Sequence, residues 1–133
     1  MLQEIIPILR IFDERKAKEF YLDYLGFHLD WEHRFEPGMP LYMQLSKSGI
    51  KLHLSEHHGD CCPGAAIRIG VKGIRSFQKQ LISKKNPYSR PGIEKTPWQS
   101  EECVVTDPFG NRIIFYEFLD REDQLGGTGQ DEC

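Results

Sequence analysis

Hydrophobic and polar positions follow one pattern twice along this chain. In residues 104–118, two apolar runs flank Asp-Pro-Phe-Gly-Asn at 107–111, and such residues between apolar runs predict the turn of a β-hairpin. Residues 42–56 carry a second copy of the pattern. The spacing that separates Gly49 from Gly110 also links Lys51 to Arg112, Leu52 to Ile113, Leu54 to Phe115 and Glu56 to Glu117. The repeat predicts a chain built from two similar halves.

The first half predicts a strand, a helix and three further strands. Residues 4–11 form an apolar, β-rich run that is typical of a strand buried on both faces. Asp13 is positioned to cap the N-terminus of a helix. Residues 27–35 alternate apolar and polar side chains, which predicts a strand with Asp30 and Glu32 on one polar face. The expected helix has an apolar stripe and a C-terminal glycine, namely Ala17, Phe20, Tyr21, Tyr24, Leu25 and Gly26.

The second half repeats this order. Residues 65–71 predict a short strand, residues 84–92 a polar connector and residues 93–96 another strand before the closing hairpin. Between the first strand and the connector lies a helical stripe made of Ile74, Phe77, Leu81 and Ile82. We therefore predict an α+β fold of two tandem βαβββ modules.

These patterns indicate a single domain over residues 1–119. Module one spans about residues 4–56 and module two about residues 65–118. Residues 120–133 hold Gly and acidic or polar side chains with few apolar ones, so we expect a flexible C-terminal tail.

Composition narrows the function classes. Of 133 residues, 39% are hydrophobic and 28% are charged with mixed sign, as in ordinary globular proteins. The net charge of −3 and the lack of a basic tract argue against nucleic-acid and membrane partners. No apolar run approaches the roughly 20 residues that span a bilayer, and the start of the chain does not look like a signal peptide, so a cytoplasmic location is expected. The four cysteines form no CxxC pair, so the sequence gives little support for a zinc or redox motif.

Two segments resemble signatures of the glyoxalase, bleomycin-resistance and extradiol-dioxygenase superfamily. The first is Ile6-Pro-Ile-Leu-Arg-Ile-Phe-Asp13, followed by Phe20-Tyr21 and Leu25-Gly26-Phe27, and the second is Asp107-Pro-Phe-Gly-Asn111 followed by strand residues. The resemblance covers residues 5–118. It implies paired βαβββ modules whose curved mixed sheet encloses a cleft, which in many members holds a divalent metal.

The resemblance also carries over the metal-ligand positions of the glyoxalases, which fall at Ile6, His53, Ala66 and Ile114. Isoleucine and alanine have no lone pair for a metal, and one imidazole cannot hold a divalent ion alone. Metal-dependent isomerase, thiol-transferase or dioxygenase chemistry is therefore disfavoured. We expect no metal and no other cofactor, and we lean against an enzyme.

Within the superfamily the chain most resembles the metal-free bleomycin-resistance proteins, which sequester the drug as homodimers. Residues 26–31 are similar to their helix exit and acidic strand, and residues 94–98 to their segment with an aromatic side chain that packs on the ligand. This implies Asp30 and Trp98 as cleft residues. Arg68 departs from the pattern, because these relatives offer an aromatic there; it suits an anionic ligand or a pairing with Asp30 or Glu32.

Several other side chains are candidates for the cleft. His53 alternates with two leucines, so it faces the cleft if they face the helices, either as a hydrogen-bonded polar residue or as a ligand contact. His57 and His58 lie in a polar loop that either contacts the ligand or is a surface turn capped by Asp60. The full set of predicted ligand-binding residues is Asp30, Glu32, Phe35, Tyr42, His53, His57, His58, Arg68 and Trp98.

The function that this sequence favours is noncatalytic binding of a small molecule by a homodimer, with sequestration of a bleomycin-type antibiotic as the specific hypothesis. Trp98 and Phe35 would stack on flat parts of the ligand, while Asp30 and Glu32 would pair with cationic groups. One alternative is a metal-dependent lyase, isomerase or dioxygenase that uses His53, and another is a regulatory subunit with a vestigial cleft. The ligand's identity and charge, an exchange of modules between subunits and any unconventional metal-dependent activity stay open.

Overall fold

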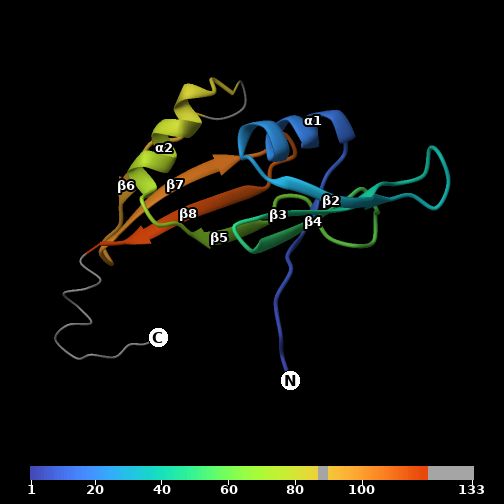
Figure 1. Ribbon diagram of the computed structural model, residues 1–133, viewed down its shortest axis with the longest axis horizontal. Coiled ribbons are helices and arrows are strands. Elements are labelled where there is room, and N and C mark those ends of the chain that lie inside the picture. Colours follow the sequence, from blue (N-terminus) through green and yellow to red (C-terminus); the bar gives the residue numbers. More distant parts are fainter. Residues whose placement is uncertain (87–89, 120–133) are drawn as a thin grey trace.

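The computed structural model describes residues 1–86 and 90–119 and has the predicted α+β architecture (Figure 1). Module one contains β1, a helix that passes from α1 into the π-helical turn η1, and then β2, β3 and β4. Module two contains β5, α2, β6, β7 and β8. The bounds are β1 Ile8–Arg10, α1 Glu14–Lys18, η1 Glu19–Tyr24, β2 His28–His33, β3 Tyr42–Lys47, β4 Ile50–Ser55, β5 Ala66–Gly70, α2 Ile74–Ser83, β6 Glu94–Lys95, β7 Ser100–Thr106 and β8 Arg112–Phe118.

The two modules form equivalent four-stranded sheets. Sheet A has the order β1-β4-β3-β2 and sheet B the order β5-β8-β7-β6, each with one parallel pair at β1–β4 or β5–β8. In sheet A, Ile8 pairs with His53; in sheet B, Arg68 pairs with Ile114. Arg68 thus occupies in module two the position of Ile8 in module one, and Ile114 occupies that of His53. The predicted repeat is confirmed.

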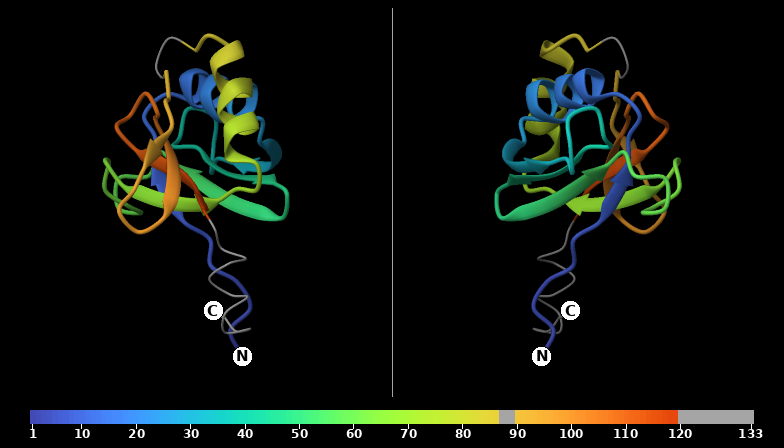
Figure 2. Two further views of the ribbon diagram at one scale, coloured as in Figure 1. Left: turned by 90° about the vertical axis from the view of Figure 1, so that its left-hand side faces the viewer. Right: turned by 90° about the vertical axis from the view of Figure 1, so that its right-hand side faces the viewer.

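Both sheets bury one face under the helices. In the two views of Figure 2, the helical segments lie on the same side of the strands. Leu9, Met43 and Leu54 of sheet A are almost fully buried on this face, as are Val105 and Ile113 of sheet B. Side chains alternate across a strand, so the neighbouring residues point to the opposite face, which no helix of the described residues covers. We call it the open face.

The predicted first strand is shorter and less buried than its sequence suggests. Strand β1 begins only at Ile8, and Ile5 is 91% exposed. Leu9 and Ile11 enter the core, whereas Ile8 faces the open side and is partly exposed. The prediction of a strand over 4–11 buried on both faces is therefore wrong, because in the described part of the chain only one face of sheet A has a covering layer.

The first helix forms as its sequence predicts. The Asp13 carboxylate caps its start by accepting a hydrogen bond of 2.9 Å from the Lys16 N–H. Gly26 ends it with a φ of +84°, which favours glycine. All five predicted stripe residues are buried: Ala17, Phe20, Tyr21, Tyr24 and Leu25. In α2 the stripe is narrower, because Ile74 and Leu81 are buried but Ile82 is exposed.

The turn at 107–111 also fastens the two modules together. The Asp107 carboxylate, in a residue only 4% exposed, accepts hydrogen bonds from the Tyr21 hydroxyl (2.6 Å), the Asn111 side-chain amide (2.9 Å) and the N–H groups of Phe109 and Asn111 (2.8 Å each). Asn111 also donates to the carbonyl of Arg10 at 2.8 Å. Burial and the Asp107 charge raise the pKa of Tyr21 well above its usual value. Module two is thus joined to module one by a buried polar cluster.

The remaining sequence expectations concern the C-terminal tail, the 84–92 connector and the strand at 93–96. The tail predicted for 120–133 and the middle of the 84–92 connector lie outside the described residues. Strand β6 covers only Glu94 and Lys95 of the strand predicted at 93–96. Among the helices of the described part, none has the length and hydropathy to cross a membrane.

Candidate ligand-binding site

A β-bulge in β2 shapes the open face of sheet A. Leu29 pairs with Leu45 and Trp31 pairs with Gln44, so Asp30 is an extra residue between two regular pairs. A bulge lets two consecutive side chains point to the same face of a sheet. Asp30 and Trp31 both do so, since Asp30 bonds to Gln44 and Ser46 while Trp31 packs on Tyr42 and His53.

Trp31 forms an aromatic platform on this face. Its ring lies nearly parallel to that of Tyr42, with an interplanar angle of 15° and 6.1 Å between ring centroids. His53 meets the indole edge to face, at 5.5 Å between centroids. Trp31 is 44% exposed, which leaves apolar surface available to a flat ligand or a cation.

A chain of hydrogen bonds runs from Tyr42 to Asp30 across sheet A. The Tyr42 hydroxyl lies 2.6 Å from Nδ1 of His53, and His53 Nε2 lies 3.0 Å from Oε1 of Gln44. The Gln44 amide nitrogen donates to Oδ2 of Asp30 at 3.0 Å. Since Gln44 uses its oxygen toward His53, Nε2 is the protonated nitrogen and Nδ1 accepts from Tyr42. Burial lowers the pKa of His53, which favours this neutral form.

Asp30 is the negative end of this chain. Hydrogen bonds from Gln44, then His28 and then Ser46, lower the pKa of Asp30 from 3.8 to about 2. The carboxylate lies at the surface and has no Lys or Arg in an ion pair within the described residues. The open face thus presents an ionised carboxylate, that of Asp30, beside an aromatic platform.

Removing the amide of Gln44 should raise the pKa of Asp30 from about 2 toward 3.8, because Gln44 is the largest cause of the lowering. NMR measures this pKa through the carboxyl ¹³C chemical shift of Asp30, which is followed from pH 6 to pH 2 in Gln44→Ala and in the parent protein. Because folding lowers the pKa of Asp30, the hydrogen bonds that its carboxylate accepts stabilise the fold above pH 3.8. This contribution to stability is lost as the pH falls toward 2. Gln80→Ala, an exposed position on α2, is the control. Titration of Asp30 near 3.8 in the parent would contradict the network.

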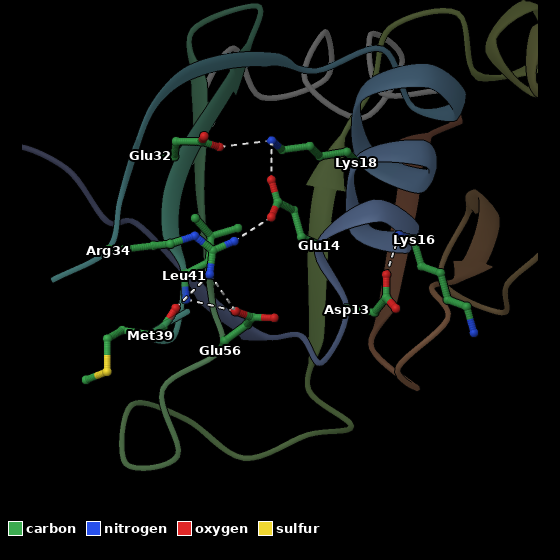
Figure 3. Close-up of polar contacts among 9 residues, drawn as sticks. All are labelled: Asp13, Glu14, Lys16, Lys18, Glu32, Arg34, Met39, Leu41 and Glu56. Atoms are coloured by element: carbon green, nitrogen blue, oxygen red, sulfur yellow. Dashed lines mark hydrogen bonds and ion pairs between the residues drawn. The ribbon is translucent and has the colours of Figure 1, made fainter. Parts of the chain in front are cut away.

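Glu32 lies on the opposite face, contrary to the predicted alternation. It pairs with Met43, whose side chain is in the core, and its carboxylate is 2.9 Å from Nζ of Lys18 on α1 (Figure 3). Lys18 also bonds Glu14 at 2.7 Å, and Glu14 bonds Arg34. Because the bulge adds one residue to β2, Asp30 and Glu32 end on different faces. Glu32 belongs to an ion-pair network that links the helix to the sheet edge.

Arg68 lies on the open face of sheet B, where it contacts Glu102 and Tyr116. It bonds Glu102 at 2.9 Å and stacks over the Tyr116 ring, with 4.6 Å from the guanidinium carbon to the ring centroid. Among the described residues of the single chain, its ion-pair partner is Glu102 and not Asp30 or Glu32. Glu102 reaches this position because it pairs with Tyr116, which pairs with Gly70 of Arg68's strand.

The remaining candidates lie around the two open faces without forming one cluster. Trp98, in the loop after β6, is 57% exposed, and Phe35, after β2, is 80% exposed with its ring against His33. His57 lies beside Tyr42, with ring centroids 6.3 Å apart, whereas His58 is exposed. The loop is held by Asp60, which accepts from Ser55 at 2.6 Å, in agreement with the surface-turn alternative. Sheet A thus gathers Asp30, Tyr42 and His53, and sheet B carries Arg68.

Sequence reasoning missed three contributors to this face. Gln44 and Ser46 hold Asp30, and Trp31 forms the platform although its pattern placed it opposite Asp30. Sequence alternation could have identified the polar face of β3. Tyr42, Gln44 and Ser46 alternate there with the buried Met43 and Leu45.

The residues at the glyoxalase metal positions do not fit a divalent metal. Ile6, Ala66 and Ile114 carry no donor atom, and both ring nitrogens of His53 already bond to Tyr42 and Gln44. Within residues 1–86 and 90–119, no three His, Cys, Asp or Glu side chains are arranged to hold a metal ion.

Comparisons with solved structures show how widespread this fold is. A bleomycin-binding protein complexed with bleomycin is 20% identical, with a TM-score of 0.68 over 87% of this chain and 98% of that one. A bleomycin resistance determinant encoded on the transposon Tn5 is 18% identical, with a TM-score of 0.67 over 88% and 98%. An antibiotic-binding protein from Streptomyces sp. CB03234 is 20% identical, with a TM-score of 0.66 over 89% and 98%. At such identity these similarities establish the fold alone.

Sequence comparison gives the family. A search among curated proteins found no significant match. A family model described as "Glyoxalase superfamily protein" matches residues 1–122, which is most of the chain and includes both modules. Together with the tandem βαβββ architecture, this match shows that the chain belongs to the glyoxalase superfamily.

Proposed function

We propose that this protein binds a small cationic molecule with a flat apolar part and sequesters it in the cytoplasm without chemical change. The observation that carries the proposal is the Trp31–Tyr42 platform beside the ionised Asp30 carboxylate. An aromatic face attracts cations, and an adjacent carboxylate adds a directed ion pair. A bleomycin-type antibiotic has this chemistry, and two similar folds belong to proteins named for bleomycin.

The environment of His53 supports binding over catalysis. A general base needs a free ring nitrogen within reach of the substrate, and His53 uses both nitrogens within the protein. Metal-assisted chemistry would need donors that Ile6, Ala66 and Ile114 cannot supply. The vestigial-cleft alternative called for a cavity filled by Trp98 and Arg68, yet Trp98 is exposed and Arg68 is held by Glu102.

A homodimer would complete the proposed cleft. The open faces of both sheets lack a covering layer in the described part of the single chain, and Trp31 and Phe118 on them are partly exposed. If sheet B of a second copy covered sheet A, Trp98 could close over the Trp31 platform. Arg68 would not oppose a cation there, because Glu102 balances its charge.

Tryptophan fluorescence tests the location of this site, since the chain contains two tryptophans. Bleomycin is titrated into Trp98→Phe, which retains Trp31, and into Trp31→Phe, which retains Trp98. Saturable quenching of the Trp31 fluorescence is expected in Trp98→Phe. An unchanged Trp31 signal at saturating drug would contradict binding at sheet A.

Trp98→Ala should weaken binding by about 1–3 kcal/mol with little loss of stability, if Trp98 is an anchor contributed to the cleft. Its exposure means that truncation leaves no cavity in the single chain. Calorimetric titration and thermal melting measure the two effects. A large fall in melting temperature with unchanged affinity would show that Trp98 is structural.

A further inference from the structure

A second site is suggested by a cavity of about 350 Å³ between the two modules. Its lining includes residues of the β3–β4 turn and of the segment from β5 to α2, two parts of the backbone that approach each other in Figure 1. Ligand pockets typically begin near this size and have mostly apolar walls with a few polar groups. Here the apolar walls include Phe27, Ile69, Phe77 and Phe115, and the polar groups include Lys47 and Lys72.

The internal repeat explains why this cavity is open. When the modules are aligned through their equivalent strands and hairpins, Lys72 takes the place of Phe12, and Ser48 takes the place of Phe109. Phe12 and Phe109 meet at the equivalent contact between the modules, with ring centroids 6.1 Å apart. At the second contact a flexible lysine and a small serine replace the two rings, so the same arrangement of strands leaves a cavity.

The cations at this cavity lack acidic partners. The Lys47 ammonium donates to the Leu25 carbonyl at 2.6 Å and lies 5.6 Å from the centre of the Phe77 ring. Among residues 1–86 and 90–119, no Asp or Glu lines the cavity, and neither Lys47 nor Lys72 forms an ion pair. Burial and then the charge of Lys84 lower the pKa of Lys47. An anion placed here would meet an ammonium that is already partly desolvated.

We propose that this cavity binds a small amphipathic carboxylate, whose apolar body lies against the phenylalanine walls and whose carboxylate pairs with Lys47 and Lys72. The anion would provide the charge partner that the protein does not supply, and the apolar body would replace the missing aromatic pair. This site is separate from the Trp31–Asp30 site on the open face of sheet A and does not depend on the function proposed there.

The test is a titration of the full-length protein with 3-phenylpropanoate, followed by ¹H–¹⁵N NMR. Saturable shifts are expected at Gly70, Val71 and Phe77, with the Trp31 indole unaffected. The neutral analogue 3-phenylpropan-1-ol should bind about tenfold more weakly, because it lacks the charge. Equal affinity for acid and alcohol, shifts confined to the open face of sheet A, or no saturation at millimolar ligand would each overturn the proposal.

Variants separate charge recognition from general packing. Lys47→Met keeps an unbranched side chain without the charge and should weaken binding about tenfold, while Lys79→Met, an exposed position on α2, should leave it unchanged. Lys72→Phe copies the residue at the equivalent position of module one and should abolish binding by filling the cavity. A melting curve confirms that each variant is folded. Unchanged affinity in folded Lys47→Met or folded Lys72→Phe would contradict the assignment.

Discussion

Asp107→Ala should lower the free energy of unfolding by about 3–5 kcal/mol, the largest stability effect expected for a single side chain here. The carboxylate accepts four hydrogen bonds, including one from Tyr21 of the other module. Its removal leaves buried donors without partners and creates a cavity at the contact between the modules. Urea denaturation followed by circular dichroism measures the change.

Asp23→Ala provides the matched control, because Asp23 is exposed, and the expected change is within about 0.5 kcal/mol. Tyr21→Phe removes only one of the donors and should cost about 1–2 kcal/mol. A loss below about 1 kcal/mol in Asp107→Ala would mean that the turn does not fasten the modules together.

Trp31→Ala should weaken bleomycin binding by about 2–4 kcal/mol, because it removes the platform on which the ligand is proposed to stack. Trp31 is partly exposed, so the loss of stability should be small compared with that effect. Isothermal titration calorimetry on the folded variant measures the affinity. Retention of the parent affinity would remove sheet A from the binding site.

A pair of neighbouring carboxylates tests the charge contribution at the same site. Asp30→Asn should reduce the affinity for a cationic ligand several-fold and weaken its dependence on salt. Glu32→Gln removes the same charge nearby on β2, but Glu32 faces Lys18 on the helix side. Glu32→Gln should therefore leave the affinity unchanged. Equal losses of affinity in the two variants would indicate a long-range charge effect only.

The repeat could be predicted from sequence because local periodicity encodes it. Leu52 and Leu54 of the first hairpin and Ile113 and Phe115 of the second all enter the core, as their alternation requires. The N-cap at Asp13 was equally predictable, since capping involves only residues close together in the chain.

The details of the site depend on contacts that a single strand does not encode. The bulge at Asp30 is defined by the pairing of β2 with β3, and it moves Trp31 onto the same face while Glu32 turns to the helices. The bond between Tyr21 and Asp107 joins residues far apart in the sequence, so only the packed modules reveal it. The extent of β1 was overestimated because apolar composition does not tell whether a layer covers each face.

Calorimetric titration of chelator-treated protein with bleomycin tests whether the protein binds such a drug and leaves it unchanged. Saturable binding of one drug molecule per chain is expected, with the drug recovered unchanged by mass spectrometry and the affinity unaltered when divalent metals are restored. Absence of saturable binding would contradict the assignment of a cationic, bleomycin-type ligand to the Trp31–Asp30 face. Conversion of the drug to a new product would contradict binding without chemical change.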